Sequence, residues 1–178
     1  MFPYPLQEPH LKGCFMKFLL LIVFLYSGLT LAKSRIGEWA AYNYEESNPE
    51  STTKGTLIKE IIDEKRMRSP DGKLINYVLV SEKLNFESKT KSISNWIPES
   101  EFLTGIELNI FMLKCRISEK IGTIEKIKVK AGNFTVCRAK GQDTWISVVP
   151  FNNVLFIFND GTHFKRMELI KFSWKLKP

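Results

Sequence analysis

Alternation of apolar and polar residues predicts β-strands over most of the chain. Residues 36–44 and 73–80 are rich in aromatic and branched apolar side chains, as strands are. Residues 124–130 alternate strictly, so that Ile127 and Val129 would point to one face of a sheet and three lysines to the other. We expect further strands at residues 134–138, 143–149, 154–158 and 163–174.

Turn-forming sequences separate these strands at short, fairly even intervals. Ser69-Pro70-Asp71-Gly72, Ala131-Gly132-Asn133 and Asn159-Asp160-Gly161 are typical of tight turns. Residues 45–54 are polar and contain an Asn-Pro pair, so we expect a loop there. The pattern predicts a mainly β (α+β) domain, built as a single curved antiparallel sheet or half-barrel with one helical segment.

The helical segment is predicted at residues 99–114. Pro98 is followed by acidic residues, which is typical of a helix start. An apolar stripe then continues at helical spacing through Phe102, Leu103, Ile106, Ile110 and Leu113. We expect a break at Gly105 and Cys115 at the end of the helix; a strand over residues 106–113 is the competing interpretation.

Two segments carry weaker patterns. Residues 56–67 have apolar side chains at helical spacing, but the tight turn that follows favours one arm of a long hairpin, so strand and helix both stay open. Residues 86–97 are rich in Ser, Thr and Lys and contain neither Gly nor Pro, which favours an exposed edge strand.

The N-terminal region has the pattern of a secretory signal peptide. Met16 and Lys17 precede an apolar run over residues 18–26, and small residues lead up to Ala32. Residues 18–32 are shorter than the roughly 20 residues that span a bilayer, so we expect cleavage after Ala32 and no stable membrane insertion afterwards.

We therefore divide the chain into a signal peptide, residues 1–32, and a single β-rich domain, residues 33–178. Residues 1–15 precede an otherwise complete signal, which indicates a gene-start artefact. The expected location is periplasmic or secreted.

Composition is that of a folded domain with a basic surface. Hydrophobic residues make up 44% of the 178 residues and charged residues 25%, which excludes a disordered chain. The formal net charge is +7, but the basic residues are scattered among acidic ones without a nucleic-acid-binding signature. We expect a solvated surface and no nucleic-acid partner.

Two cysteines, Cys115 and Cys137, lie in the predicted exported domain. An even pair in an oxidising compartment favours a disulfide. The alternatives are two buried free thiols or a redox-active pair, although the spacing differs from Cys-x-x-Cys.

The C-terminal part of the chain carries an ordered series of motif residues, which are Ala131, Gly132, Phe134, Cys137, Trp145, Pro150 and Phe151, followed by Glu168-Leu169. The series resembles the signature of a family of uncharacterised exported domains from Gram-negative bacteria, and the resemblance covers about residues 115–174. That family is distantly similar to periplasmic lipoprotein-carrier half-barrels. The resemblance implies a half-barrel, an exported location and a bridge between Cys115 and Cys137, but no activity. Asn152 and Asn153 stand where the family usually has Gly.

Catalytic residues are sparse. His163 is the only histidine of the predicted domain, and no nucleophile partner is evident beside it. No cluster of residues suggests a zinc site or a phosphate loop, so we expect no enzyme, no metal and no cofactor. A hydrolase based on His163 is the third-ranked hypothesis.

Two non-enzymatic functions remain. The first is a binding or carrier module for a lipophilic ligand, because the strand at 154–158 is apolar on both faces and aromatic residues are abundant. The alternative is a structural or protein-interaction domain of the cell envelope that uses the edge strand at 86–97.

Overall fold

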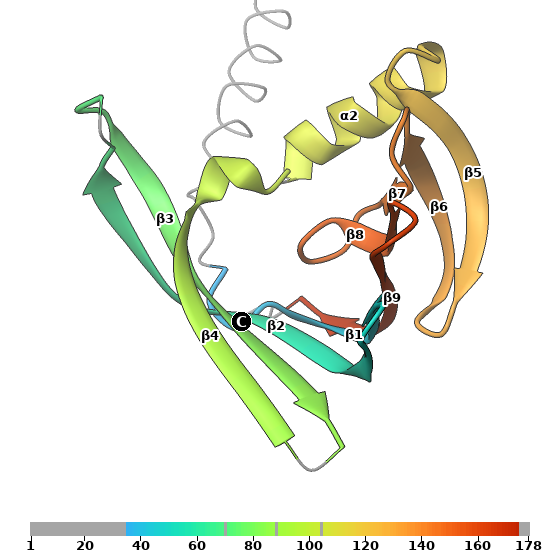
Figure 1. Cartoon of the computed structure of the whole chain (residues 1–178). Helices are drawn as coiled ribbons and strands as arrows, with labels where there is room; N and C mark the ends of the chain where they lie inside the picture. The colour runs from blue at the N-terminus through green and yellow to red at the C-terminus, as the bar shows by residue number, and fades with distance from the viewer. Residues whose placement is uncertain (1–34, 70, 88, 104, 175–178) are drawn as a thin grey trace, which may run out of the picture. The chain divides into compact units, whose positions relative to one another are not determined.

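The structure is a computed structural model that describes residues 35–69, 71–87, 89–103 and 105–174. These residues form one open antiparallel sheet of nine strands with one α-helix, which confirms the predicted mainly β class (Figure 1). The predicted signal peptide, residues 1–32, lies outside the described residues.

The elements follow one another in a simple chain order. They are β1 (Trp39–Asn48), β2 (Ser51–Arg68), β3 (Leu74–Phe86), β4 (Lys89–Pro98), the 3-10 turn η1 (Glu99–Glu101), α2 (Gly105–Ile117), β5 (Gly122–Val129), β6 (Gly132–Ala139), β7 (Thr144–Ile146), β8 (Asn153–Asn159) and β9 (Phe164–Ser173).

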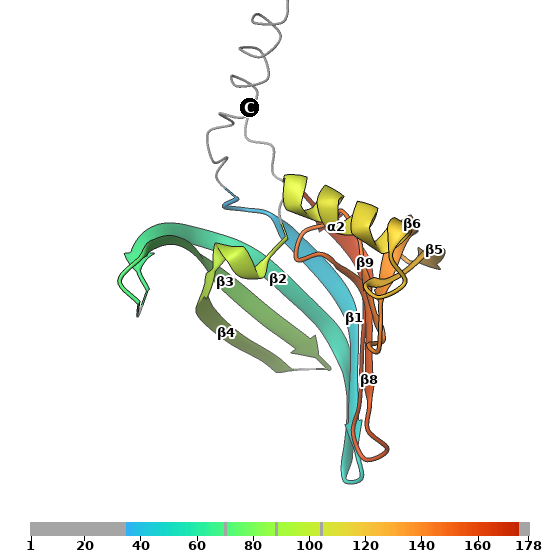
Figure 2. The same ribbon diagram turned by 90° about the horizontal axis from the view of Figure 1, so that it is seen from above.

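The first and last strands meet in the middle of the sheet. The strand order is β4-β3-β2-β1-β9-β8-β7-β6-β5, and every neighbouring pair is antiparallel. Trp39 of β1 pairs with Ser173 of β9. The sheet curls until β4 and β5, its two edges, stand on opposite sides of a concavity, and α2 crosses the open side (Figures 1 and 2).

Buried apolar side chains gather in one cluster, and every strand contributes to it either a fully buried residue or, in the case of β4, a half-buried neighbour. In β1 the buried residues are Ala40, Tyr42 and Tyr44, which share one face because side chains alternate along a strand. Ile97 of β4 and Phe102 after η1 pack against the same cluster. The cluster therefore marks the concave face.

The ambiguous segment 56–67 is a strand. Residues 51–68 form β2, and they pair with β3 from Thr56↔Asn85 to Arg68↔Leu74. The predicted exposed edge strand at 86–97 is also confirmed, as β4 at the end of the sheet.

Two predicted boundaries are wrong. The expected loop at 45–54 is strand except at its tip, because the hairpin continues until Asn48 Oδ1 accepts hydrogen bonds from the backbone N–H groups of Glu50 and Ser51 at 2.9 and 2.8 Å. The expected strand at 143–149 ends at Ile146. The chain then turns back, and the backbone N–H of Ser147 donates to the carbonyl of Asn152.

A helix in the predicted segment is confirmed, but it runs from Gly105 to Ile117 instead of from 99 to 114, and the competing strand at 106–113 is wrong. Helix α2 starts at Gly105, where φ is +27°, after the separate turn η1. Its buried residues are Leu108 and Cys115, whereas Ile106, Ile110 and Leu113 of the predicted stripe are exposed. In the described part of the chain no helix is long and apolar enough to cross a membrane.

Candidate functional site

Helix α2 is fastened to the sheet at its C-terminal end by a disulfide. Cys115 is bonded to Cys137 of β6, with Cα atoms 6.0 Å apart, which confirms the predicted bridge. Gly122 of β5 packs against this bond, since a Cβ atom there would collide with the carbonyl of Arg138 and lie 2.9 Å from Cys137 Sγ. The close approach explains why a residue without a side chain stands at this position.

The N-terminal end of α2 is held by Asn152, one of the two residues at which the sequence differs from the signature that it resembles. Its Nδ2 donates to the carbonyl of Leu103 and its Oδ1 accepts from the Leu103 N–H, both at 2.9 Å. The φ of Asn152 is +61°, which asparagine tolerates better than most residues. An asparagine therefore supplies the turn geometry that glycine would allow and adds a clamp on the segment before α2.

We call α2 together with the segment before it the lid. The other motif residues make two contact groups, one beside the lid and one at the β5–β6 turn. Pro150 is buried, and Phe151 packs edge-on against Phe102 with ring centroids 5.7 Å apart. In the other group, the N–H of Ala131 donates to the carbonyl of Leu169 at 3.2 Å, next to Gly132 at φ +135°, and Phe134 packs on Phe172.

Trp145, the remaining motif residue, is the buried central residue of β7. Its indole N–H donates to Glu125 of β5, and the Arg138 guanidinium lies 5.0 Å from the ring centre. Trp145 thus joins β7 to β5 across β6.

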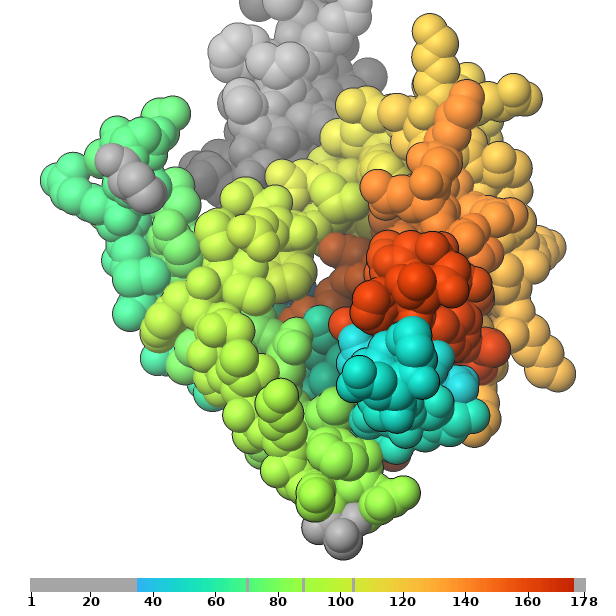
Figure 3. All heavy atoms as spheres, in the orientation of Figure 1, coloured from blue at the N-terminus to red at the C-terminus, as the bar shows by residue number. Residues whose placement is uncertain are grey.

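A hollow lies on the concave side beside this lid. Figure 3 shows an opening between the yellow-green residues of η1 and the start of α2 and the orange-red residues behind them. The concave face is apolar: Leu57, Ile61, Val78, Val80, Val154 and Leu169 belong to its buried cluster. Ile93, opposite Glu82 on β4, is 54% exposed, so the apolar surface continues uncovered to the edge of the sheet.

A small polar group interrupts this apolar face. Lys59 lies between Leu57 and Ile61 on β2, and Glu82 lies directly opposite on β3. Alternation places both on the concave side. Lys59 Nζ is 2.6 Å from Glu82 Oε1.

Tyr42 of β1 lies diagonally beside this ion pair, because Ala40 pairs with Lys59 and Tyr42 with Leu57. Its side chain is 1% exposed, and its hydroxyl has no hydrogen-bond partner among the described residues. Burial raises the pKa of the Tyr42 phenol above its usual range, and the charge of Glu82 raises it further. The hydroxyl therefore stays protonated and is an unused donor on the concave face.

A second unpaired polar atom lies at the rim near η1. Arg35 Nε is 2.9 Å from Glu38 Oε2, and the guanidinium lies 5.4 Å from the Phe102 ring centre. Its Nη1 is buried without a partner in the described ranges. Burial raises the pKa of Glu38 despite Arg35, and Glu99 and Glu64 add to the increase. The rim is acidic, so it does not favour an anion.

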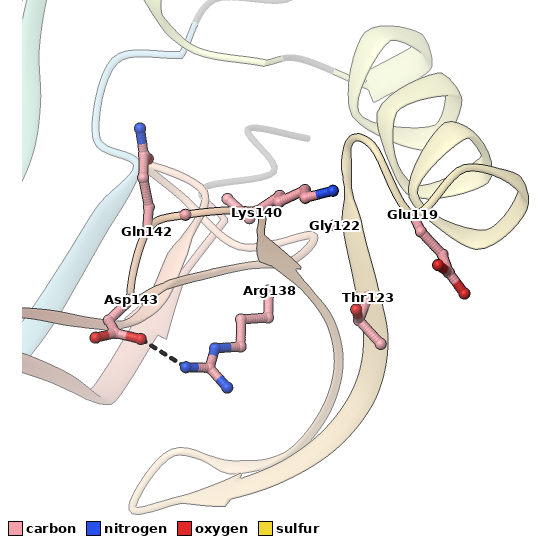
Figure 4. Close-up of a pocket in the computed structure, with 9 residues that line it drawn as sticks. Glu119, Gly122, Thr123, Arg138, Lys140, Gln142 and Asp143 are labelled. Carbon is pink, nitrogen blue, oxygen red and sulfur yellow. Dashed lines mark hydrogen bonds and ion pairs between the residues drawn. The ribbon is translucent and has the colours of Figure 1, made fainter.

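A separate polar pocket of about 420 Å³ opens where the β6–β7 turn meets α2 and β5 (Figure 4). Arg138 and Asp143 point toward each other in it and form an ion pair at 2.6 Å, while Gln142 points away (Figure 4). The pocket is open to solvent and its arginine is already paired, so we assign it no ligand.

The hydrolase hypothesis gains little from the surroundings of His163. His163 Nδ1 lies 2.9 Å from the Thr162 hydroxyl and 3.5 Å from Asp160 Oδ2. All three residues belong to one exposed turn, where Asp160 accepts hydrogen bonds from the backbone N–H groups of Thr162 and His163. These contacts build the turn rather than a substrate cleft. Within the described ranges, no three His, Cys, Asp or Glu side chains are grouped to hold a metal ion.

No protein-family model matches the chain, and no curated protein or solved structure is significantly similar to it. The resemblance to exported half-barrel domains therefore stays a prediction, as do the expected absence of catalysis and cofactors.

The polar group on the concave face was missed in the sequence, although a signal was present. Once residues 56–67 are known to be a strand, Lys59 stands between Leu57 and Ile61 on a buried face. Glu82 similarly stands between Val80 and Leu84 on β3. A charged residue flanked at i±2 by core residues on each of two adjacent strands indicates a polar spot inside a sheet.

Proposed function

We propose that this protein is a non-enzymatic carrier or binding module for a lipophilic ligand that carries an oxygen acceptor. The observation behind the proposal is an apolar concave face, hollow beside a lid fixed at both ends, in which the Tyr42 hydroxyl is buried without a partner. The apolar part of the ligand would lie along the strands, and its oxygen would accept from Tyr42.

The energetics favour such a ligand. A buried donor without an acceptor costs about 1–3 kcal/mol, and a ligand oxygen beside Tyr42 would recover that cost. Each methylene of the ligand that leaves water contributes about 0.8 kcal/mol. Lys59, already paired with Glu82, would orient the polar end rather than neutralise it.

The location we propose is periplasmic or secreted. Disulfides persist in oxidising compartments, and the Cys115–Cys137 bond supports export together with the predicted signal peptide. A carrier of lipophilic molecules is needed where these must cross an aqueous space.

The test combines native mass spectrometry with a binding assay on the exported protein. We expect a co-purified mass that leaves on denaturation, and uptake of the apolar dye N-phenyl-1-naphthylamine that oleate displaces. Tyr42→Phe should weaken oleate about fivefold, the value of one hydrogen bond, and leave the dye affinity unchanged. Tyr44→Phe is the matched control, because Tyr44 Oη already donates to Glu46 at 2.5 Å. The absence of both bound mass and dye uptake would refute the proposal.

The alternative, an envelope protein-interaction domain, would use β4. This edge strand is exposed from Lys89 to Asn95. Lysines at an edge discourage pairing with another strand, and β4 carries Lys89 and Lys91, so we rank this function second.

A further inference from the structure

Helix α2 exposes an apolar stripe on the side away from the sheet. The stripe consists of Ile106, Ile110, Leu113 and Ile117, which are 72%, 47%, 55% and 73% exposed. Their spacing of four, three and four residues places them in one row along the helix.

The opposite side of the same helix is already used. Leu108 and Cys115 are buried, Cys115 by its bond to β6 of the sheet, and both lie about half a turn away from the stripe. Because Cys115 is bonded to Cys137, the helix cannot rotate to bury the stripe instead. A helix that is apolar on both sides is expected to be covered on both.

Basic residues flank the stripe in its C-terminal half. Lys114 and Arg116 lie on either side of the row, and Lys120 follows in the next turn of chain. All three are exposed. The acidic residues of the region are Glu107 in the first turn and Glu119 after the helix, so positive charge predominates where Leu113 and Ile117 lie.

We propose that this stripe docks the protein on an anionic lipid surface. A helix lying in a membrane interface needs one apolar row with Lys and Arg beside it, whose alkyl stems pass along the lipid while their charges reach the headgroups. A stable contact with a second copy or another protein needs roughly 1,000 Å², more than a single row of four aliphatic side chains offers.

Vesicle co-sedimentation of the exported protein tests the proposal. We expect binding to phosphatidylglycerol vesicles that falls at least tenfold in Ile110→Gln/Leu113→Gln, because glutamine keeps the helix but removes apolar area. The matched control is Ile62→Gln/Leu74→Gln, whose side chains are 42% and 50% exposed on the other half of the sheet; it should bind within twofold of the parent. Lys114→Gln and Arg116→Gln should each weaken binding roughly fivefold, and neutral phosphatidylcholine vesicles should bind less.

Three results would overturn the proposal. They are no binding to anionic vesicles, equal binding by the stripe variant, and a dimer in sedimentation velocity that the stripe variant abolishes while vesicles stay unbound. The last would assign the stripe to a second copy. Since the stripe faces away from the concave face, the result is independent of the ligand assay, and dye uptake by the stripe variant should be unchanged.

Discussion

The two sides of the curved sheet are stabilised differently. The braced half, β5–β8 with α2, has strands of three to eight residues. It is cross-linked by the Cys115–Cys137 bond, by Trp145 to Glu125, and by Ser147 Oγ donating to the carbonyl of Thr135 at 2.7 Å.

The open arm, β2–β4, relies on long backbone ladders. β2 and β3 have 18 and 13 residues. The side-chain contacts there include the Lys59–Glu82 pair and Lys65 Nζ, 3.9 Å from the centre of the Trp96 ring. One continuous sheet can therefore have one half fixed by side-chain cross-links and another held mainly by backbone hydrogen bonds between strands. We expect the open arm to unfold locally before the braced half does.

The largest effect should follow loss of the disulfide. Cys115→Ser with Cys137→Ser should lower the free energy of unfolding by about 3 kcal/mol, from the chain entropy of the released loop. Denaturant unfolding gives this value. Amide hydrogen exchange should show lost protection in α2 and β6 but not in β2 and β3, and equal loss in both halves would remove the distinction between them.

A matched glycine pair sharpens the comparison. Gly122 faces the carbonyl of Arg138 in the braced half, and Gly55 faces the carbonyl of Asn85 in the open arm. Overpacking costs 1–3 kcal/mol, so we expect about 2 kcal/mol for Gly122→Ala and about 1 kcal/mol for Gly55→Ala, where the ladder can shift. Thermal or denaturant unfolding measures both. A larger loss of stability for Gly55→Ala than for Gly122→Ala would contradict the conclusion that the braced half is the more rigid one.

The Asn152 clamp should matter less than the disulfide. Asn152→Gly keeps the left-handed backbone but removes both hydrogen bonds to Leu103. We expect a loss of about 1 kcal/mol, with faster exchange at the start of α2. Asn152→Ala adds backbone strain and should cost more; equal stability of the two variants would show that the turn conformation is not strained.

The smallest effects concern two turn aspartates, one in each half. Hydrogen bonds from the backbone N–H groups of His163 and Thr162 lower the pKa of Asp160, and the Ser69 hydroxyl and Lys73 lower the pKa of Asp71. A lowered carboxyl pKa contributes stability above the ordinary value of 3.8, and this is lost as the pH falls through the folded-state pKa.

Asp160→Asn and Asp71→Asn should therefore each reduce stability slightly at pH 7, and the difference from the parent should shrink below pH 4. Unfolding titrations between pH 2 and 7 check this. A difference that grows on acidification would contradict the sign of both shifts.

Much of the fold was predictable because alternation and turn residues act locally. The lysines of 124–130 and the turn at Asn159-Asp160-Gly161 defined their hairpins correctly. The prediction of a loop at 45–54 was wrong because polar residues there were interpreted as irregular structure. The tip of the β1–β2 hairpin extends past the core, so its strands need no apolar side chains.

The site was less predictable because it depends on long-range packing. The stripe through Ile106, Ile110 and Leu113 indicated a helix correctly, but only the disulfide partner in β6 determines which side is buried. The proximity of Tyr42 to Lys59 and Glu82 follows from the register of three strands, and no local pattern contains that register.

The pairing of β1 with β9 has a consequence for synthesis. Trp39–Asn48 can pair with Ser51–Arg68 as soon as both have left the ribosome, but the other edge of β1 has no partner until Phe164–Ser173 has been made. Unpaired edges of this kind recruit foreign strands. A chain truncated before residue 164 should therefore aggregate instead of folding in part. Pairing of β9 with β1 is the step that completes the sheet.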